Sequence, residues 1–152
     1  MKDIQAALRS RLEKTRDFAG KLPSRYHYRN PYGFVLQEGR FFEPRPLPNS
    51  IERGAPRECF YNAWQTAIIN ELSYVEGYAV RKAKDLPVLH AWNLDTEGFV
   101  IDTTWEAVGV GYFGVILPQE FAPSLGTHSA IDNWESDFPM LRNSWQRVVG
   151  KA

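Results

Sequence analysis

The chain's only cysteine lies in the stretch Arg57-Glu58-Cys59-Phe60-Tyr61-Asn62-Ala63-Trp64-Gln65-Thr66-Ala67. Apolar residues recur in and after this stretch at helical spacing, and they predict a helix from Cys59 to about Glu71. A thiol in the first turn of a helix meets unpaired N–H groups and the positive end of the helix dipole, which favour the thiolate. A lone cysteine is more often a small buried hydrophobe. Its place at a helix start still makes Cys59 a candidate nucleophile.

The composition limits the classes of function that this chain can have. Its 152 residues suit a single domain, and 18 basic residues balance 18 acidic ones. A balanced charge gives no electrostatic reason to expect nucleic acid or an anionic membrane as partner. One cysteine excludes an internal disulfide, and the three histidines, His27, His90 and His128, show no metal-ligand spacing. We therefore expect no cofactor and no metal.

Neither a signal core nor a membrane span is visible in the sequence, because no stretch approaches ~18 consecutive apolar residues. We therefore expect a cytoplasmic protein. The oligomeric state is left open.

Helices followed by a meander of strands and then further helices predict an α+β domain covering residues 1–152. Residues 1–22 should supply a helix that packs on a core at about 56–117, and a proline-rich loop should lead into the cysteine helix. Expected helices lie at 3–19, 59–71, and in short pieces near 118–121 and 129–134. Expected strands lie at 33–37, 41–42, 73–80, 87–94, 99–103 and 112–117.

The register of one hairpin decides which residues meet the cysteine. If Thr96-Glu97-Gly98 is a three-residue loop with Gly98 in the left-handed region, Asp102 falls diagonally beside His90 on the same sheet face. A two-residue turn would place Asp102 on the other face. Because Gly98 favours the longer loop, we expect a carboxylate–imidazole pair.

Together these residues predict a Cys59–His90–Asp102 triad. Cys59 would attack a carbonyl carbon, His90 would carry the thiol proton to the leaving amine, and Asp102 would orient the imidazole. The backbone N–H of Cys59 would donate to the oxyanion. A second donor is needed, and Gln37 is the leading candidate, followed by Asn62 and Tyr61.

Aromatic residues make up 14% of the chain and suit either a core or an aromatic-lined cleft. Four of them are candidate substrate contacts, although such residues belong more often to a core: Trp92, Tyr78, Trp105 and Tyr112. In the same region, Gly77 inside the 73–80 strand marks a bulge or a close approach of two backbones.

Four motifs stand in order along the chain: the cysteine stretch at 57–67, Tyr74-Val75-Glu76-Gly77-Tyr78, His90-Ala91-Trp92-Asn93, and Val100-Ile101-Asp102-Thr103-Thr104-Trp105. This order resembles the transglutaminase-like branch of the papain-like cysteine enzymes, over about residues 56–117. The resemblance implies a nucleophile helix packed on a small antiparallel sheet, with His90 and Asp102 on successive strands. The flanking N- and C-terminal helices are expected from the residue pattern and lie outside the resemblance. The aspartate motif of that superfamily usually continues Asp-Pro-Thr, whereas Thr103 replaces the proline here, and the Cys-to-His spacing is short.

The resemblance implies a chemistry more than a substrate. The expected protein is a cofactor-free thiol enzyme that acts on a peptide, protein or other amide through an acyl–cysteine intermediate. Hydrolysis by a protease or amidase is favoured over transglutaminase-type transfer, because water needs no second binding site. Two alternatives stay open: a binding module that keeps the fold without catalysis, and a cysteine-dependent acyltransferase with a donor pocket near Trp92 and Tyr112.

Overall fold

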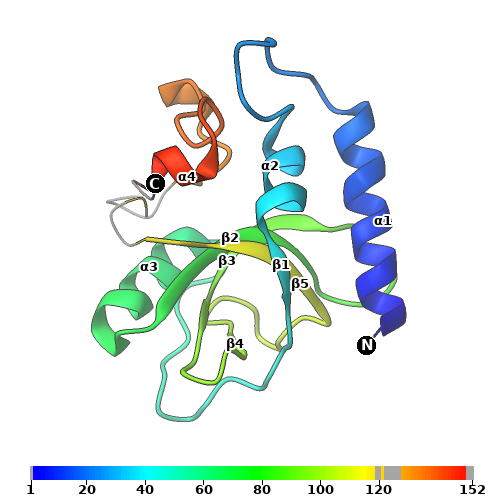
Figure 1. The fold of residues 1–152 in the computed structure, drawn as a ribbon. Helices are drawn as coiled ribbons and strands as arrows, with labels where there is room; N and C mark the ends of the chain where they lie inside the picture. The colour runs from blue at the N-terminus through cyan, green and yellow to red at the C-terminus, as the bar shows by residue number, and fades with distance from the viewer. Residues whose placement is uncertain (1, 119–120, 122–127, 150–152) are drawn as a thin grey trace.

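The computed structural model describes residues 2–118, 121 and 128–149 and is built around an antiparallel sheet with the strand order β1-β5-β2-β3-β4 (Figure 1). The strands are β1 Arg40–Phe42, β2 Ser73–Val80, β3 Val88–Leu94, β4 Val100–Ile101 and β5 Gly111–Leu117. The helices are α1 Lys2–Phe18, α2 Pro31–Glu38, α3 Cys59–Asn70 and α4 Trp145–Val148, with a short 3₁₀ turn at Trp134–Ser136. These described elements confirm the α+β class.

The sheet is buried on both faces, so β2 is buried at every position after its first. Tyr74 and Tyr78 face one side, where they pack into a core with residues of the α-helices; we call this side the helix face. Val75 and Trp92 face the other side, where loops rather than helices cover the sheet; we call it the loop face. In Figure 1 α2 and α4 lie above the sheet, while β4 and the 43–58 loop lie below it.

The N-terminal helix packs as expected. Leu8 and Leu12 are buried in the helix-face core, and α1 packs against α2 and β5. The helix expected at 3–19 corresponds to α1, Lys2–Phe18. None of the described helices combines the length and the apolarity that crossing a membrane requires.

The predicted strand at 33–37 is wrong, because these residues belong to α2. Asn30 caps this helix: its side-chain oxygen accepts a hydrogen bond of 2.9 Å from the backbone N–H of Gly33. Pro31 occupies the first helical position, where its fixed φ suits a helix and its missing N–H costs nothing. The pair Asn30-Pro31 is typical of a turn, but it is equally typical of the start of a helix.

The other strands lie close to their predicted ranges, with one informative exception. The strand expected at 99–103 is reduced to β4, since the chain turns at Asp102, whose carboxylate accepts the backbone N–H groups of Thr104 and Trp105. In the tail, the predicted helix at 129–134 is wrong: the structure has a turn there and the 3₁₀ turn follows it. The one expected near 118–121 falls largely on residues 119–120, outside the described part of the chain.

Gly77 lies where two backbones approach closely, as the sequence suggested. It pairs directly with Gly114 on β5, and a Cβ atom at Gly77 would fall 2.1 Å from the carbonyl oxygen of Phe113. A Cβ at Gly114 would in turn fall 2.7 Å from the indole of Trp92. Gly77 therefore permits the close approach of β2 and β5, and Gly114 makes room for the Trp92 ring.

Candidate functional site

The hairpin between β3 and β4 has the predicted odd-length loop. Gly98 adopts a φ of 88°, and its N–H donates to the carbonyl of Asp95 at 3.0 Å. Asp95 donates to the carbonyl of Phe99 at 3.0 Å, and Leu94 pairs with Val100. The predicted register is confirmed. It places the side chain of Asp102, the residue after β4, on the face of the sheet that carries His90 and Trp92.

His90 and Asp102 meet on the loop face. The Nε2 atom of His90 lies 2.9 Å from Oδ2 of Asp102, and both side chains are almost completely buried. Tyr112 donates its hydroxyl to the same oxygen at 2.7 Å, while Oδ1 accepts the N–H groups of Thr104 and Trp105. The Trp105 ring stacks on the imidazole with 4.0 Å between centroids. The imidazole is thus fixed by a hydrogen bond at Nε2 and by the indole stacked on its ring face.

The hydrogen bonds around Asp102 favour its charged form. Burial alone would raise the pKa of this carboxyl group, but the hydrogen bond and charge of His90, with the Tyr112 hydroxyl and the Thr104 N–H, bring the pKa below its usual value. Asp102 is therefore an ionised acceptor at neutral pH. When the imidazole is neutral, its hydrogen therefore lies on Nε2, facing Asp102, and Nδ1 is the ring nitrogen with the free lone pair.

Cys59 opens α3, as predicted, and is half-buried against the helix-face core. Its sulfur lies near the backbone N–H of Ala91, the residue that follows His90, and that N–H favours the thiolate. Since β4 pairs only with Asn93 and Leu94, the edge of β3 next to His90 and Ala91 carries no neighbouring strand in the described structure. Within the described residues no hydrogen bond joins the sulfur to the imidazole. In the described structure the Cys59 thiol therefore lies at the unpaired edge of β3, at the residue next to His90, without a hydrogen bond to the imidazole.

The surroundings of Cys59 favour the neutral thiol. Burial, together with the nearby carboxylates of Glu76 and Asp102, raises the pKa of this thiol to about 11, and the N–H groups of Ala91 and Phe60 oppose this rise only in part. The helix start alone does not make a thiolate here, since desolvation outweighs the helix dipole.

We expect the iodoacetamide alkylation rate of Cys59 to keep rising about tenfold per pH unit through pH 9.5, because only the thiolate reacts. A thiol with the unperturbed pKa of about 8.5 would reach its plateau before then. The rate is measured by mass spectrometry on protein that circular dichroism shows to be folded, with Cys59→Ser as the unreactive control. A plateau below pH 8.5 would contradict a protonated resting thiol.

Glu76 is a site residue that the sequence interpretation did not single out. Its carboxylate is fully buried on the helix face and accepts hydrogen bonds from Tyr74, Ser129, Ala130 and Ile131. Burial raises its pKa more than these hydrogen bonds lower it. The signal was present in Tyr74-Val75-Glu76-Gly77-Tyr78, because a charged residue between two inward-facing tyrosines of one strand must itself face inward.

The three candidate oxyanion donors occupy different environments. Gln37 is exposed on α2, which packs mainly against α1 and β5. The amide nitrogen of Asn62 already donates to the carbonyl of Ala55 at 2.8 Å and to Oγ1 of Thr104 at 2.9 Å. Tyr61 is 36% exposed beside Trp64. The structure therefore uses Asn62 to tie α3 to the loops, and it brings neither Gln37 nor Tyr61 into the His90 network.

All four candidate substrate contacts are buried core residues in the structure. Trp92 and Tyr112 are fully buried on the loop face, and Tyr78 stacks on Tyr32 within the helix-face core. Tyr112 instead acts on Asp102 through its hydroxyl, which also accepts the N–H of Gly109 at 2.7 Å. Only Trp105 among the four lines a described cavity.

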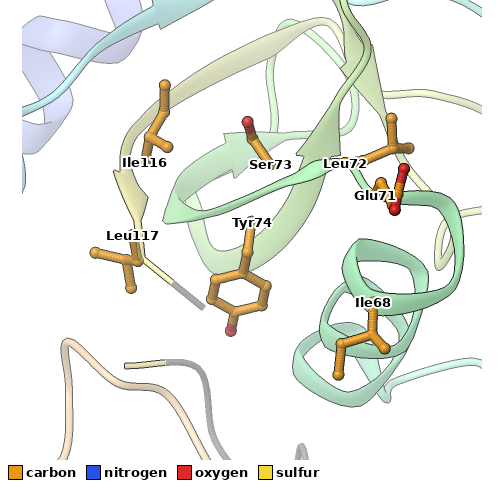
Figure 2. Close-up of a pocket in the computed structure, with 7 residues that line it drawn as sticks. All are labelled: Ile68, Glu71, Leu72, Ser73, Tyr74, Ile116 and Leu117. Carbon is orange, nitrogen blue, oxygen red and sulfur yellow. The ribbon is translucent and has the colours of Figure 1, made fainter. Parts of the chain in front are cut away.

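Two cavities differ in their relation to the site. The one in Figure 2, about 540 Å³, lies between Ile68 of α3 and Leu117 of β5, with Tyr74 pointing toward it. Neither a thiol nor an imidazole lines it, so it supports no catalytic assignment. A larger cavity of about 810 Å³ lies beside Trp105 and is lined by Pro56 and Arg57, just before Cys59. We call it the Trp105 cavity.

In the part of the chain that the structure describes, no three His, Cys, Asp or Glu side chains converge as metal ligands. Comparison with known protein families, curated proteins and solved structures finds no match to this chain. A functional assignment therefore depends on the site alone.

Proposed function

We propose that the protein is a thiol enzyme that acts on an amide or related acyl group, with Cys59 as nucleophile, His90 as general base and Asp102 as the residue that positions His90. The proposal includes the transglutaminase-like core inferred from the order of the four motifs. The observation that supports it most directly is the buried His90–Asp102 pair at 2.9 Å, beside the strand edge that the Cys59 sulfur approaches.

The raised pKa of Cys59 determines how such a reaction starts. A thiol that is neutral at rest must lose its proton as it attacks, so the base acts in the same step rather than in a preformed ion pair. The sulfur forms a bond to the carbonyl carbon while Nδ1 of His90 takes the thiol proton. The tetrahedral oxyanion then collapses, the amine leaves with the proton from His90, and an acyl–Cys59 thioester remains.

Water resolves the thioester in the version we favour. His90 accepts a proton from the water as it adds, and the thiol is regenerated when the carboxylic acid leaves. Transfer to an amine would follow the same steps with the amine replacing water. Hydrolysis needs the smaller number of dedicated groups, which is the reason for preferring a protease or amidase.

A binding module without catalysis is the second candidate, and one specific observation favours it. The thiol has a pKa of about 11 and makes no hydrogen bond to His90 among the described residues. A buried, unreactive thiol of this kind would simply complete the core under α3. The two candidates differ in whether Cys59 accepts an acyl group.

Acylation of Cys59 by p-nitrophenyl acetate tests the proposal. We expect release of p-nitrophenol with an acetyl group on Cys59, and we expect His90→Ala to slow this step about 10²- to 10⁴-fold, the usual contribution of a general base. Mass spectrometry of the intact protein and the absorbance of p-nitrophenol measure the two products.

His27→Ala is the matched control, because His27 is exposed in a loop before α2 and takes no part in the site. It should acylate at the wild-type rate, and Cys59→Ala should not acylate at all. Equal rates in His90→Ala and wild type would leave the binding module as the better assignment.

A further inference from the structure

The Trp105 cavity carries an unusual concentration of positive charge. Four basic side chains line it, Arg53, Arg57, Arg81 and Lys82, against the single carboxylate of Glu106. The chain as a whole is electrically balanced, with 18 basic and 18 acidic residues. The positive charge of this cavity is therefore a local feature and does not reflect a net positive charge of the chain.

Most of this charge has no ion-pair partner among the described residues. The ion pairs among the described residues involve Arg16, Arg45 and His90, and none involves the cations of this cavity. Arg53 is engaged differently, because its guanidinium donates to the carbonyl oxygens of Trp105 at 3.1 Å and Glu106 at 2.7 Å. It holds the wall in place.

Arg57, Arg81 and Lys82 remain as exposed cations that a ligand can engage. Arg57 adopts a φ of 65°, the left-handed region that non-glycine residues rarely adopt. Arg57 thus lies where the chain enters α3, and its side chain lines this cavity. Such a backbone conformation persists where the surrounding structure enforces it.

The cavity walls are tied together before any ligand binds. Gly54 donates its N–H to the carbonyl of Thr103 at 2.7 Å, which joins the loop before α3 to the turn after β4. Asn62 of α3 bonds to both loops, at Ala55 and at Thr104. A preorganised pocket loses little entropy when it binds, so these ties favour recognition of a small group.

The cavity also adjoins the candidate catalytic residues. Trp105 stacks on His90 at 4.0 Å, and the guanidinium of Arg81 lies 5.0 Å from the centre of the same Trp105 ring. Arg57 precedes Cys59 by two residues. A group bound among these cations would therefore lie beside the site of chemistry.

We propose that the Trp105 cavity binds a carboxylate of the substrate, so that the preferred substrate is an amide or peptide with an acidic side chain next to the reacting bond. Pro56, Trp105 and Val108 supply apolar lining for the aliphatic stem of such a side chain, and the cations meet its carboxylate. A dianionic phosphate is less suited, because Glu106 also lines the cavity. The position of the reacting bond rests on the proposed function, whereas the carboxylate site can be tested without it.

Two probes that differ only in charge test the site: N-acetylglutamate N-methylamide and N-acetylglutamine N-methylamide. Binding is followed by amide chemical shifts in ¹⁵N-labelled full-length protein, and inorganic phosphate is titrated separately. We expect shifts at Arg57, Lys82 and Trp105, with the acidic probe binding at least fivefold more tightly and weakening as salt is added.

Charge-removing variants assign the effect to the cavity. Arg57→Gln, Arg81→Gln and Lys82→Gln should each weaken the acidic probe by about twofold or more, as removal of one unit charge about 10 Å away in water would do. Arg81→Lys keeps the charge and should restore binding. Lys14→Gln, which removes an exposed cation from α1, should bind as wild type does.

Equal binding of the two probes, or tighter binding of phosphate than of the acidic probe, would overturn the carboxylate assignment. The acylation experiment tests the catalytic proposal independently of this binding experiment. Selective binding without acylation of Cys59 would leave the carboxylate site standing and remove the catalytic proposal. Acylation of Cys59 with equal binding of the two probes would support the catalytic proposal and remove the carboxylate site.

Discussion

Replacing Glu76 with alanine is expected to lower the free energy of unfolding by about 3–5 kcal/mol, because several buried donors lose their acceptor and each costs about 1–3 kcal/mol when unpaired. The carboxylate accepts the N–H groups of Ala130 and Ile131, the Ser129 hydroxyl and the Tyr74 hydroxyl. It thereby fixes the turn at Ser129–Ile131 to the middle of β2. Urea unfolding followed by tryptophan fluorescence measures the change.

Glu76→Gln is the matched variant, since it keeps the shape and one acceptor oxygen. We expect it to lose about 1–2 kcal/mol, the scale of one weakened buried hydrogen bond. If alanine and glutamine cost the same, the hydrogen bonds to 129–131 do not hold this segment to the sheet. The comparison therefore separates loss of the acceptor from loss of the charge.

The pH dependence gives a second measure of Glu76. A carboxyl group whose pKa is raised on folding binds more protons in the folded state, so its contribution to stability is complete below its unfolded pKa and is lost as pH rises through the folded value. Wild type should therefore lose stability relative to Glu76→Gln as the pH rises from about 4.5. Asp102, whose pKa is lowered, acts in the opposite direction and at lower pH.

The sheet could be predicted from the sequence because its signals are local. Short runs rich in apolar and aromatic residues predicted β2, β3 and β5, and Gly98 predicted the loop length that set the position of Asp102. The 33–37 segment misled because Asn30-Pro31 serves both turns and helix starts, and the short apolar run that follows fits either element. Only packing against α1 and β5 decides between them.

The environment of the thiol could not be predicted in this way. A helix start lowers the pKa of a thiol only if the thiol stays hydrated, and burial depends on contacts distant in sequence. Glu76 lies 17 positions after Cys59 and the Ser129 turn lies farther still, yet the Glu76 charge helps to set the pKa of the thiol. The Trp105 cavity is likewise formed by three segments that are distant in sequence, and none of them predicts a binding site on its own.

Asp102→Asn is expected to slow acylation of Cys59 by about 10²- to 10⁴-fold, as His90→Ala does, while costing only about 1–3 kcal/mol of stability. Oδ1 of Asp102 accepts the N–H groups of Thr104 and Trp105, and an asparagine must keep its oxygen there to avoid opposing donors. Its NH₂ group then faces Nε2 of His90 and donates to it. The imidazole proton moves to Nδ1, where it blocks acceptance of the thiol proton.

A purely structural role for Asp102 would slow every reaction of Cys59 together, and the electrostatics of the site predict otherwise. The Asp102 charge helps to raise the pKa of the thiol, so its removal should leave alkaline iodoacetamide alkylation unchanged or faster. Acylation by p-nitrophenyl acetate at neutral pH should fall in the same protein, because that reaction needs the Nδ1 lone pair of His90. Opposite responses of one sulfur to the two reagents would assign Asp102 to positioning the base. A parallel decline, in protein that circular dichroism shows to be folded, would contradict the triad.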